Sequence, residues 1–565
     1  MRPRLGRLTG FERFLSLFTS VRPGEGTSVL FLFATAFVLM ACYYILKPVR
    51  DALILAEGSA EIKAYSQGIV AVTLVFILPL YKQLYEGLSD HESRSRVLHW
   101  VTAFFISNLV IFYLLGHGGI PISVPFYVWL SIFNVTVVAQ FWAFAADLYN
   151  TRSGQRLFVV IMVGSSIGAW VGSQASKYLF SMIGGYGLML LAAGILVLPI
   201  FLSVLAERAV PEGSENMSRE QIGDGRLTLA DLVGGFDIVL KSRYLTIIAV
   251  LILVITMVNT AGEYIVSHFV DARAEALAAA PGATLTEVEY LGRFWGDYYA
   301  WITLFSMLLQ LFVVSRIFRW VGIRGAVLVL PMFIIIHYGI LWVLPVFGAV
   351  RILQIAENAI SYSLQNTTNH SLYLPLEREE KYVGKTTIDT FFFRAGDAAI
   401  AALVFVLIDR LGLGIEAFIA LGFFLGIVAL FAAFEIRRLH KQAIKRNLSN
   451  LPPKITAPLP DVYVPAGQLL MFSVPEGCFM DPDPGDTLEY QAQQIDGSPL
   501  PKWVKFDRHN QTFEVRPPGQ SEGSVTVQVI ASDFEGLTVE CSFEIEHGVE
   551  GHPEFRPTSE DPAGA

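Results

Sequence analysis

Polar and charged side chains recur within an otherwise apolar stretch, residues 346–374. Their spacing of three or four residues places them on one face of a helix. The side chains on this face are Arg351, Gln354, Asn358, Tyr362, Gln365 and Asn369. An ionised group at the middle of a bilayer costs about 3 kcal/mol, so such a face does not point at lipid. The pattern predicts a helix that lines a transport path. The alternative is a polar helix packed inside a bundle without substrate traffic.

Three carboxylates, Asp147, Glu263 and Glu357, lie in or beside apolar stretches of the chain. Each could bind a coupled proton or a substrate cation, or form an ion pair with a basic residue such as Arg351. The sequence holds no phosphate-binding loop of the G-x-x-x-x-G-K-[S/T] type and no other catalytic constellation. We therefore expect a protein that binds and moves its ligand and is not an enzyme.

The composition indicates a membrane protein. Of the 565 residues, 53% are hydrophobic and 16% are charged, and the mean hydropathy is +0.51, whereas soluble domains carry about a quarter charged residues. No basic block is interleaved with aromatic residues, so no nucleic-acid partner is expected. Cys42, Cys478 and Cys541 are too few for a disulfide framework and lack metal-ligand spacing.

Apolar runs of about 20 residues predict twelve transmembrane helices. They are expected at 26–46, 62–82, 97–115, 122–147, 157–177, 185–206, 244–266, 294–315, 326–345, 346–374, 390–409 and 414–436. The predicted cytoplasmic loop 207–243 separates two six-helix halves, 26–206 and 244–436. We therefore predict an all-α polytopic, major facilitator-like bundle in which two similar halves alternate access to a site near the bilayer midplane.

Basic residues collect in alternate loops of this scheme. Arg152 and Arg156 follow the fourth span and Arg316 and Arg319 follow the eighth, whereas the opposite loops carry almost no charge. The positive-inside rule then places both termini, including the N-terminal segment 1–25, in the cytoplasm. We expect a multi-pass protein of the inner (plasma) membrane, with the lipid bilayer as a partner.

The loop GLSDHESRSR, which contains Gly87, Asp90 and Arg94, resembles the loop motif of the major facilitator superfamily. In that superfamily an Asp and an Arg help to latch the cytoplasmic side. The resemblance implies a gate at this loop. Asp147, at the end of the fourth span, is a further candidate gating residue.

Several separated motifs resemble the ATP/ADP translocase family, which exchanges nucleoside tri- and diphosphates in plastids and intracellular bacteria. The motifs are VRPGE at 21–25, YYILKPVRDALIL in span one, QFWAFAADLY in span four, GGFDIVLKSRYL before span seven, VNTAGEYIV within it, and the region from ENAISYSLQNTTNHSLYLP to KTTIDTFFFRAGD. They extend over roughly residues 20–440. The resemblance implies a facilitator-like carrier that exchanges ATP for ADP across an inner membrane.

The resemblance also implies an anion site. Arg50, beside Lys47 and Asp51, stands where the family usually has a lysine in a Lys-Asp pair, and Lys385 matches the lysine that opens the family's eleventh span. Arg and Lys both bind phosphate oxygens. We expect Arg50 and Lys385 to form the anion site, helped by Arg351 or Arg394. The alternative for the basic residues is snorkelling at the membrane interface or pairing with Asp51 and Asp397.

The sequence departs from the family at some candidate positions. Asn259 takes the place of an acidic residue in span seven, with Glu263 one turn later, and Asn369 replaces the arginine of a Thr-Ala-Arg segment in span ten. Asn358 and Asn366 complete the predicted substrate-binding set. The predicted substrate is therefore a nucleotide, such as ATP or ADP, or another anionic phosphorylated metabolite.

After span twelve a basic, proline-rich linker at 437–459 precedes short alternating segments at 460–548, which predict a small antiparallel β-sandwich. The pattern resembles cadherin-like or bacterial immunoglobulin-like domains, which implies a possible protein partner. Acidic residues in its turns could bind calcium through oxygen ligands or could simply form the turns. They are Asp481, Asp483, Asp486, Asp533 and Glu535. No other cofactor is expected, and residues 549–565 are predicted to be a disordered tail.

Two classes of function remain open. The first is secondary transport of the anionic substrate. The second is a membrane-anchored binding module in which the sandwich is the working part. An anchor has no need of Arg351, Glu357 and Lys385 inside its spans, so intramembrane polar groups discriminate between the two classes.

Overall fold

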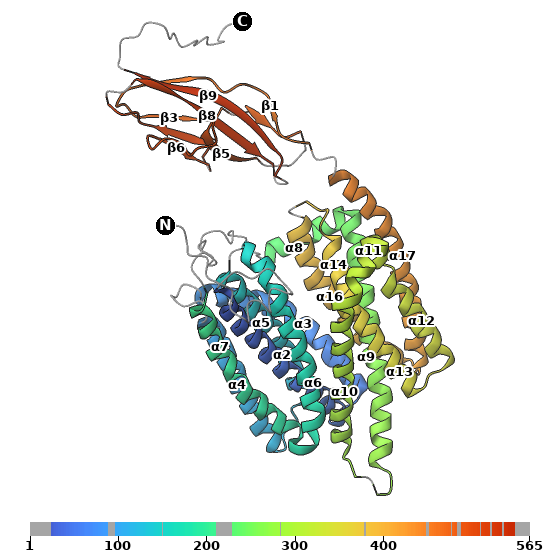
Figure 1. Ribbon diagram of the computed structural model, residues 1–565. Coiled ribbons are helices and arrows are strands. Elements are labelled where there is room, and N and C mark those ends of the chain that lie inside the picture. The colour runs from blue at the N-terminus through green and yellow to red at the C-terminus, as the bar shows by residue number, and fades with distance from the viewer. Residues whose placement is uncertain are drawn as a thin grey trace. The chain divides into compact units, whose positions relative to one another are not determined.

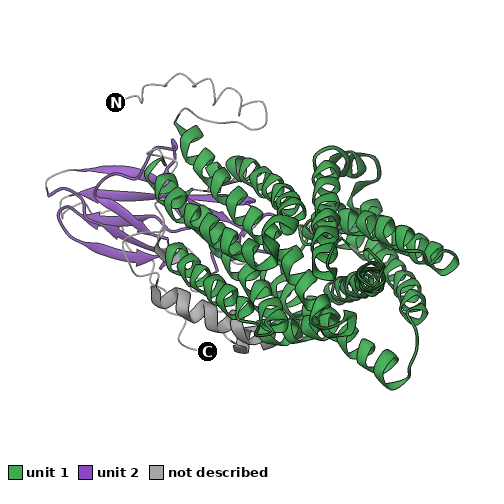
Figure 2. Cartoon of the chain, turned by 90° about the horizontal axis from the view of Figure 1, so that it is seen from below, with its two compact units in different colours: residues 1–443 green, residues 444–565 purple. Residues whose placement is uncertain are grey.

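The chain divides into two units, residues 1–443 and residues 444–565 (Figure 2). We describe each unit by itself. The structure is a computed structural model that describes residues 24–548. The segments left out within that range are 89–95, 150, 211–228, 283, 378–379, 448–450, 476, 483–487, 509, 520–521 and 534–535.

In the described part of the first unit, apolar sequence and helix-forming residues give helices as the regular elements (Figure 1). The first half contains α2 (Glu25–Ala56), α3 (Ala60–Leu88), α4 (Arg96–His117), α5 (Ser123–Leu148), α6 (Thr151–Ile195) and α7 (Val197–Arg208). The second half begins with α8 (Leu229–Lys241), α9 (Arg243–Ala278), α10 (Glu287–Leu308), η1 (Leu309–Val313), α11 (Val314–Ala326) and α12 (Val329–Val343). It continues with α13 (Phe347–Ile360), η2 (Ser361–Gln365), α14 (Asn366–Leu372), η3 (Glu380–Gly384), α15 (Lys385–Thr387), η4 (Ile388–Phe392), α16 (Phe393–Val404), η5 (Phe405–Arg410) and α17 (Glu416–Asn447).

Among the described residues, eight helical stretches are long and apolar enough to cross a membrane, and α12 is a shorter apolar helix. The predicted all-α polytopic fold is confirmed, while the count of twelve spans stays a prediction. Two of the long stretches are interrupted by a kink at a glycine with non-helical backbone angles. These glycines are Gly184 (φ 69°) within α6 and Gly322 (φ 66°) within α11. Side chains with a Cβ rarely adopt positive φ. These glycines therefore separate helices that follow each other without a loop, close to the predicted ends of spans five and eight.

Some boundaries differ from the sequence-based prediction. The predicted central loop holds a helix, α8, and the helix of the eleventh span begins at Glu380, ten residues before the predicted start at 390. The last helix, α17, continues to Asn447 through most of the predicted basic linker. Arg, Lys, Leu and Gln are good helix formers, and no Gly or Pro lies between Gly426 and Pro452, so nothing in the linker sequence up to Asn447 terminates the helix.

Helix α2 lies at the centre of the first half and packs closely on α6. Gly164, Gly168 and Gly172 of α6 recur every four residues, and a Cβ at Gly168 would lie 2.2 Å from the Phe37 carbonyl oxygen of α2. The absence of side chains lets the two backbones approach each other. This contact holds α2, which carries several candidate site residues, in a fixed position.

The second unit is an immunoglobulin-like sandwich (Figure 1). Its strands are β1 (Lys454–Ile455), β2 (Val462–Pro465), β3 (Leu470–Ser473), β4 (Phe479–Met480), β5 (Glu489–Gln494), β6 (Val504–Asp507), β7 (Thr512–Val515), β8 (Gly523–Ser532) and β9 (Thr538–Gly548). The sheets have the orders β2-β9-β8-β5, β3-β7-β6 and β1-β4. The predicted sandwich was wholly antiparallel, but β2 pairs with β9 in parallel, with Val462 opposite Ile545.

Candidate substrate-binding site

Three of the predicted site residues lie together near the C-terminal end of α2. Lys47, Arg50 and Asp51 are spaced three and four residues apart and share one face of the helix. Pro48, between them, has no N–H to donate to the preceding turn, which favours a local bend. All three side chains are buried, Asp51 completely. The interior of the bundle therefore holds charged groups from this face of α2.

The carboxylate of Asp51 is the centre of this cluster. Arg50 donates from Nε (3.0 Å) and Nη2 (2.8 Å) to Asp51 Oδ1, and the hydroxyl of Tyr299 on α10 donates to Oδ2 (2.6 Å). Lys63 Nζ, in the first turn of α3, lies 3.5 Å from Oδ1. The cluster thus joins helices α2 and α3 of the first half to α10 of the second half.

Aromatic rings surround the cations of the cluster. Lys47 Nζ lies 4.0 Å from the centroid of the Tyr299 ring, and Lys63 Nζ lies 3.8 Å from that of Trp295. The Arg50 guanidinium carbon lies 4.2 Å from the centroid of Tyr127 on α5. The negative face of an aromatic ring attracts a cation and replaces part of its hydration. These rings allow charged groups to remain inside the bundle without a carboxylate for each of them.

The charges of the cluster do not cancel. We name the set of Lys47, Arg50 and Lys63 the cation cluster. Arg50 and Lys63 contact the carboxylate of Asp51, and a second carboxylate, Glu263, interacts electrostatically with Lys47 and Lys63, so three basic groups face two acidic ones. Lys63 is 2% exposed and its ammonium makes no hydrogen bond within the described part of the chain. An excess of buried positive charge is expensive unless an anion compensates it. The arrangement is therefore suited to bind an anion.

Lys63 was missed in the sequence analysis, although it lies within the second predicted span, 62–82. The signal was a lysine inside an apolar run, which by the membrane argument should mark a functional group or an interfacial anchor. Lys63 is the second residue of that span, where a lysine is also expected as an interfacial anchor. Only the packing of α3 against α2 and α10 shows that the side chain is buried.

A cavity of ≈ 490 Å³ lies between helices of both halves. Gln67 of α3 comes from the first half, and the other walls are formed by α9, the run from α13 to α14, and α16. The polar lining residues are Gln67, Thr256, Asn259, Thr260, Glu263, Asn358, Ser361, Tyr362, Gln365, Asn366, Asn369 and Asp397. Its volume lies within the range of about 300 to 1,000 Å³ that is usual for small-molecule sites.

Four of the six polar residues predicted on one helix face line this cavity: Asn358, Tyr362, Gln365 and Asn369. The helix widens to a π-helix at η2 between α13 and α14, a feature that is frequent at functional sites. Gln354 instead packs against Gly262, where a Cβ would lie 2.4 Å from its amide. The predicted polar face therefore turns to the cavity along the last part of α13, η2 and α14.

The remaining intramembrane candidates have protein partners. Arg351 pairs with Asp297 of α10, which also accepts a 2.5 Å bond from Lys177 of α6. Glu357 is fully buried and lies 2.5 Å from His337 Nδ1 on α12. These contacts agree with the ion-pairing alternative for both residues.

The two basic candidates of the eleventh helix also pair locally. Lys385 donates to Asp389 at 2.6 Å, and Arg394 to Asp397 at 3.3 Å. Among the described residues, Lys385 and Arg50 share no ion-pair partner. The structure therefore places Lys385 in a set of contacts separate from the cation cluster, and its expected role in the anion site stays a prediction.

Further contacts join the halves at the end of the bundle where α2 leads into α3. Tyr264 of α9 donates to Glu61 at 2.8 Å, and Tyr65 donates to Asp409 of η5. Gln67 donates to Glu263 at 2.7 Å at the edge of the cavity. Together with the Lys177–Asp297 pair, they hold the two halves together on this side.

Most of the predicted gate and calcium site lies outside the described residues. This applies to Asp90, Arg94, Asp483, Asp486 and Glu535. Gly87 lies in α3, and Asp147 is half-buried in the last turn of α5. Asp533 accepts the Leu537 backbone N–H at 2.8 Å, as a turn-forming acid does, and the described residues form no group of acids, His or Cys suited to a metal, Asp481 included.

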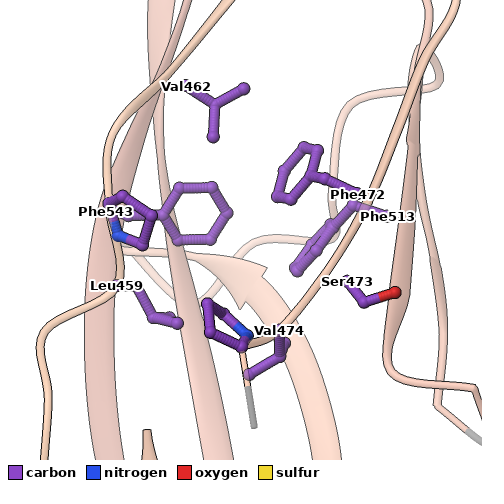
Figure 3. A pocket seen from close by; sticks show the side chains of 9 residues that line it. Leu459, Val462, Phe472, Ser473, Val474, Phe513 and Phe543 are labelled. Atoms are coloured by element: carbon purple, nitrogen blue, oxygen red, sulfur yellow. The ribbon is translucent and has the colours of Figure 1, made fainter. Parts of the chain in front are cut away.

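The sandwich holds an apolar hollow of ≈ 160 Å³ between its sheets (Figure 3). Phe472, Phe513 and Phe543 face one another across it, with Leu459 and Val462 at its side. These residues belong to or contact the hydrophobic core of the domain. Such a lining offers almost no polar group to orient a ligand, so the hollow is part of the core packing.

Comparisons with known sequences agree with the predicted resemblance. Residues 7–117 match the TLC ATP/ADP transporter family model, and residues 452–547 match the He_PIG model of an Ig domain. The chain is 20% identical over 446 residues to ADP,ATP carrier protein 5 of Rickettsia bellii, covering 66% of this chain and 86% of that protein. It is 21% identical over 450 residues to ADP,ATP carrier protein 1 of Chlamydia muridarum, covering 68% and 83%.

Solved structures with a similar fold are transporters. The crystal structure of a mutant of the nucleoside transporter NupG matches with a TM-score of 0.54 at 11% identity, over 72% of this chain and 99% of that one. The POT family transporter PepTSo matches with a TM-score of 0.50 at 12% identity, over 74% and 98%. The protein is thus a multi-pass membrane protein of facilitator-like fold, with sequence similarity to the ATP/ADP transporters and an added Ig-like domain.

Proposed function

We propose that this protein is a secondary carrier that exchanges nucleotides such as ATP and ADP across the inner membrane. The observation that carries the proposal is the cation cluster, in which the three buried basic groups Lys47, Arg50 and Lys63 outnumber the two carboxylates, Asp51 and Glu263, with which they interact. Similarity to ADP,ATP carrier proteins over two thirds of the chain supports the substrate class.

The cluster has the chemistry that phosphate requires. Arg50 can bind two phosphate oxygens with its planar guanidinium, and the two lysines act as point charges. Its groups at present contact Asp51, so an incoming phosphate competes with that carboxylate for Arg50 and Lys63. Because Asp51 also binds Tyr299 of the second half, this competition changes a contact between the halves. Substrate binding is thereby coupled to their relative movement.

The same charge balance favours exchange over net transport. A carrier without an anion must change conformation with its buried cations uncompensated, which raises the barrier to that movement. A bound nucleotide removes the excess charge, so the loaded carrier moves more readily. Import of one nucleotide is then tied to export of another.

A transport assay with matched variants tests this proposal. Proteoliposomes loaded with ADP should take up labelled ATP, and empty ones should take up much less. Lys63→Gln should weaken the apparent affinity by about ten- to a hundredfold, the loss expected for one charge-assisted bond. Lys241→Gln is the control, because Lys241 is 75% exposed on α8. No ATP uptake, or unchanged affinity in Lys63→Gln, would refute the proposal.

We further propose that both termini face the cytoplasm and that the protein does not hydrolyse its substrate. The basic loops support the orientation. A tag after Ala565 should be inaccessible in intact spheroplasts and accessible after permeabilisation. Labelling of Cys541 by an impermeant thiol reagent in intact cells would show the opposite orientation.

In this proposal the Ig-like domain, together with any protein partner that it binds, is an addition to the carrier. A membrane anchor for that domain would not need buried cations inside its spans. Calcium binding by this domain stays a prediction, because Asp483, Asp486 and Glu535 lie outside the described residues.

A further inference from the structure

The cavity beside the cation cluster has a wall that is rich in hydrogen-bond acceptors. Glu263 and Asp397 line it with carboxylates, and none of the described lining residues is Lys or Arg. Two amide oxygens of the lining, Asn259 Oδ1 and Gln365 Oε1, are buried and have no hydrogen-bond partner within the described part of the chain. Buried acceptors without a donor are rare in proteins. The wall is therefore suited to a ligand that donates hydrogen bonds and is unsuited to a phosphate.

The amide nitrogens of this wall already donate to protein groups. Asn259 Nδ2 donates to Ser361 Oγ at 3.3 Å, and Gln365 Nε2 donates to Asn369 Oδ1 at 2.8 Å. Asn358 Nδ2 donates to the Gln354 carbonyl at 2.9 Å. These bonds leave the amide oxygens of Asn259 and Gln365 as the groups without partners.

The cavity and the cation cluster are adjacent parts of one site. Asn358 of the cavity wall donates to the Tyr298 hydroxyl at 3.3 Å. The Tyr298 ring lies 5.4 Å from that of Tyr299, whose hydroxyl binds Asp51 in the cluster. Glu263 interacts electrostatically with Lys47. The cavity wall and the cluster therefore lie close to each other.

We propose that the cavity receives the nucleobase and selects bases with an exocyclic amine, with Glu263 and Asn259 as the specificity-determining acceptors. This inference rests on the proposed function, since it assigns the second part of the same site. Carboxylates accept from the amine of cytosine, and amide side chains pair with adenine. Tyr362 and Phe393 of the lining supply aromatic surface on which a base can stack. A keto base would instead direct its carbonyl oxygen at acceptors.

The test compares ADP with IDP, which carries a carbonyl oxygen where ADP has its amine. In proteoliposomes the wild-type protein should show about a ten- to hundredfold lower apparent affinity for IDP, because a site built for a donor rejects an analogue without it. Glu263→Gln presents an amide that can also donate, and Asn259→Leu removes an acceptor. Both should reduce the preference for ADP to less than about threefold, through weaker ADP binding.

Glu275→Gln is the matched control, because Glu275 is exposed on the same helix, α9, beyond the cavity. It should keep the wild-type preference. Arg50→Gln should weaken ADP and IDP by the same factor, since both carry the same phosphates. Equal affinity for ADP and IDP in the wild type, or an unchanged preference in both cavity variants, would overturn the nucleobase assignment alone. Uptake of neither nucleotide would overturn the proposed function as well.

Discussion

The helical unit buries charged side chains, whereas the sandwich has an apolar interior. In the helical unit Lys47, Arg50, Asp51 and Lys63 are at most 7% exposed. In the described part of the sandwich the core consists of residues such as Phe513, and Asp533 is the buried charged side chain. Burying charge is unfavourable unless partners compensate it. The cluster of buried charges in the helical unit is therefore the feature that we connect with ligand binding, and the described part of the sandwich has no such cluster.

The two units also differ in the groups that bind their buried carboxylates. Asp533 accepts a backbone N–H from Leu537 in its own turn, four residues away. Asp51 is bound by Arg50, Lys63 and Tyr299, which come from three helices. A local backbone contact stabilises a turn, while side chains from separate helices can exchange partners when the helices move. The comparison therefore predicts large functional effects in the first unit and effects on stability alone in the second.

The largest effect is expected from Asp51→Asn. It removes the carboxylate that Arg50 and Lys63 contact, and removing one partner of a buried pair destabilises a protein by about 3–5 kcal/mol. We expect transport to be abolished and the unfolding temperature of the detergent-purified protein to fall. Added ATP should reverse part of the fall in the unfolding temperature, because its phosphates replace the missing negative charge. Full transport activity in this variant would contradict the inference that the buried charges of the helical unit serve transport.

Phe513→Ala should have a comparable effect on stability in the sandwich but none on transport. Phe513 is fully buried, and a Phe→Ala substitution in a core costs about 3–5 kcal/mol. Limited proteolysis should cleave the variant within residues 451–548, while nucleotide exchange by the helical unit continues at the wild-type rate. A loss of transport would show that the sandwich contributes to the carrier's activity.

Substitutions of Arg50 and Lys385 should weaken substrate affinity to different degrees, and both effects should be smaller than that of Asp51→Asn. Arg50→Gln removes a buried guanidinium and should weaken substrate affinity by about ten- to a hundredfold. Lys385 has Asp389 as a partner and its side chain is 30% exposed, so Lys385→Gln should weaken affinity by less than about tenfold. Equal losses in the two variants would support the prediction that both residues form the anion site.

The smallest effect concerns an exposed group of the sandwich. The Ser498 hydroxyl and backbone N–H donate to Asp496, and these bonds hold the pKa of Asp496 below its ordinary value. A carboxyl with a lowered pKa in the folded state stabilises the fold above its unfolded pKa of about 3.9, and this contribution is lost as the pH falls through the folded value. Chemical denaturation of Asp496→Asn and the wild type should differ slightly at pH 7 and converge below pH 4. A constant difference would contradict the role of ionisation.

Much of the fold was predictable because it follows from local rules. A bilayer requires helices of apolar residues, so the runs around α2, α9 and α17 were recognisable, and alternation with turn residues predicted the sandwich. Helix ends were predicted less well. Helices α8 and α17 differ from the predicted loop and linker because amphipathic and basic helices outside the bilayer lack the long apolar run on which the prediction relied.

The candidate site was predictable in its residue types and only partly in its contacts. A polar face on 346–374 follows from spacing along one helix, and Asn358, Tyr362, Gln365 and Asn369 do line a cavity. Periodicity within a helix says nothing about the neighbouring helix, however. The pairing of Arg351 with Asp297 and of Glu357 with His337 could not be inferred from it.

Local sequence is sufficient to specify apolar helices, a polar helix face, charged residues on α2 and a separate sandwich, because each depends on residues that are neighbours in the chain. The meeting of Lys63, Trp295 and Tyr299 around Asp51 depends on how α3 and α10 pack against α2. The acceptor-rich wall likewise requires α9 to lie beside η2, where Asn259 donates to Ser361 and Gln365 donates to Asn369. Distance along the chain does not encode these contacts, so only the tertiary structure brings the two parts of the site together.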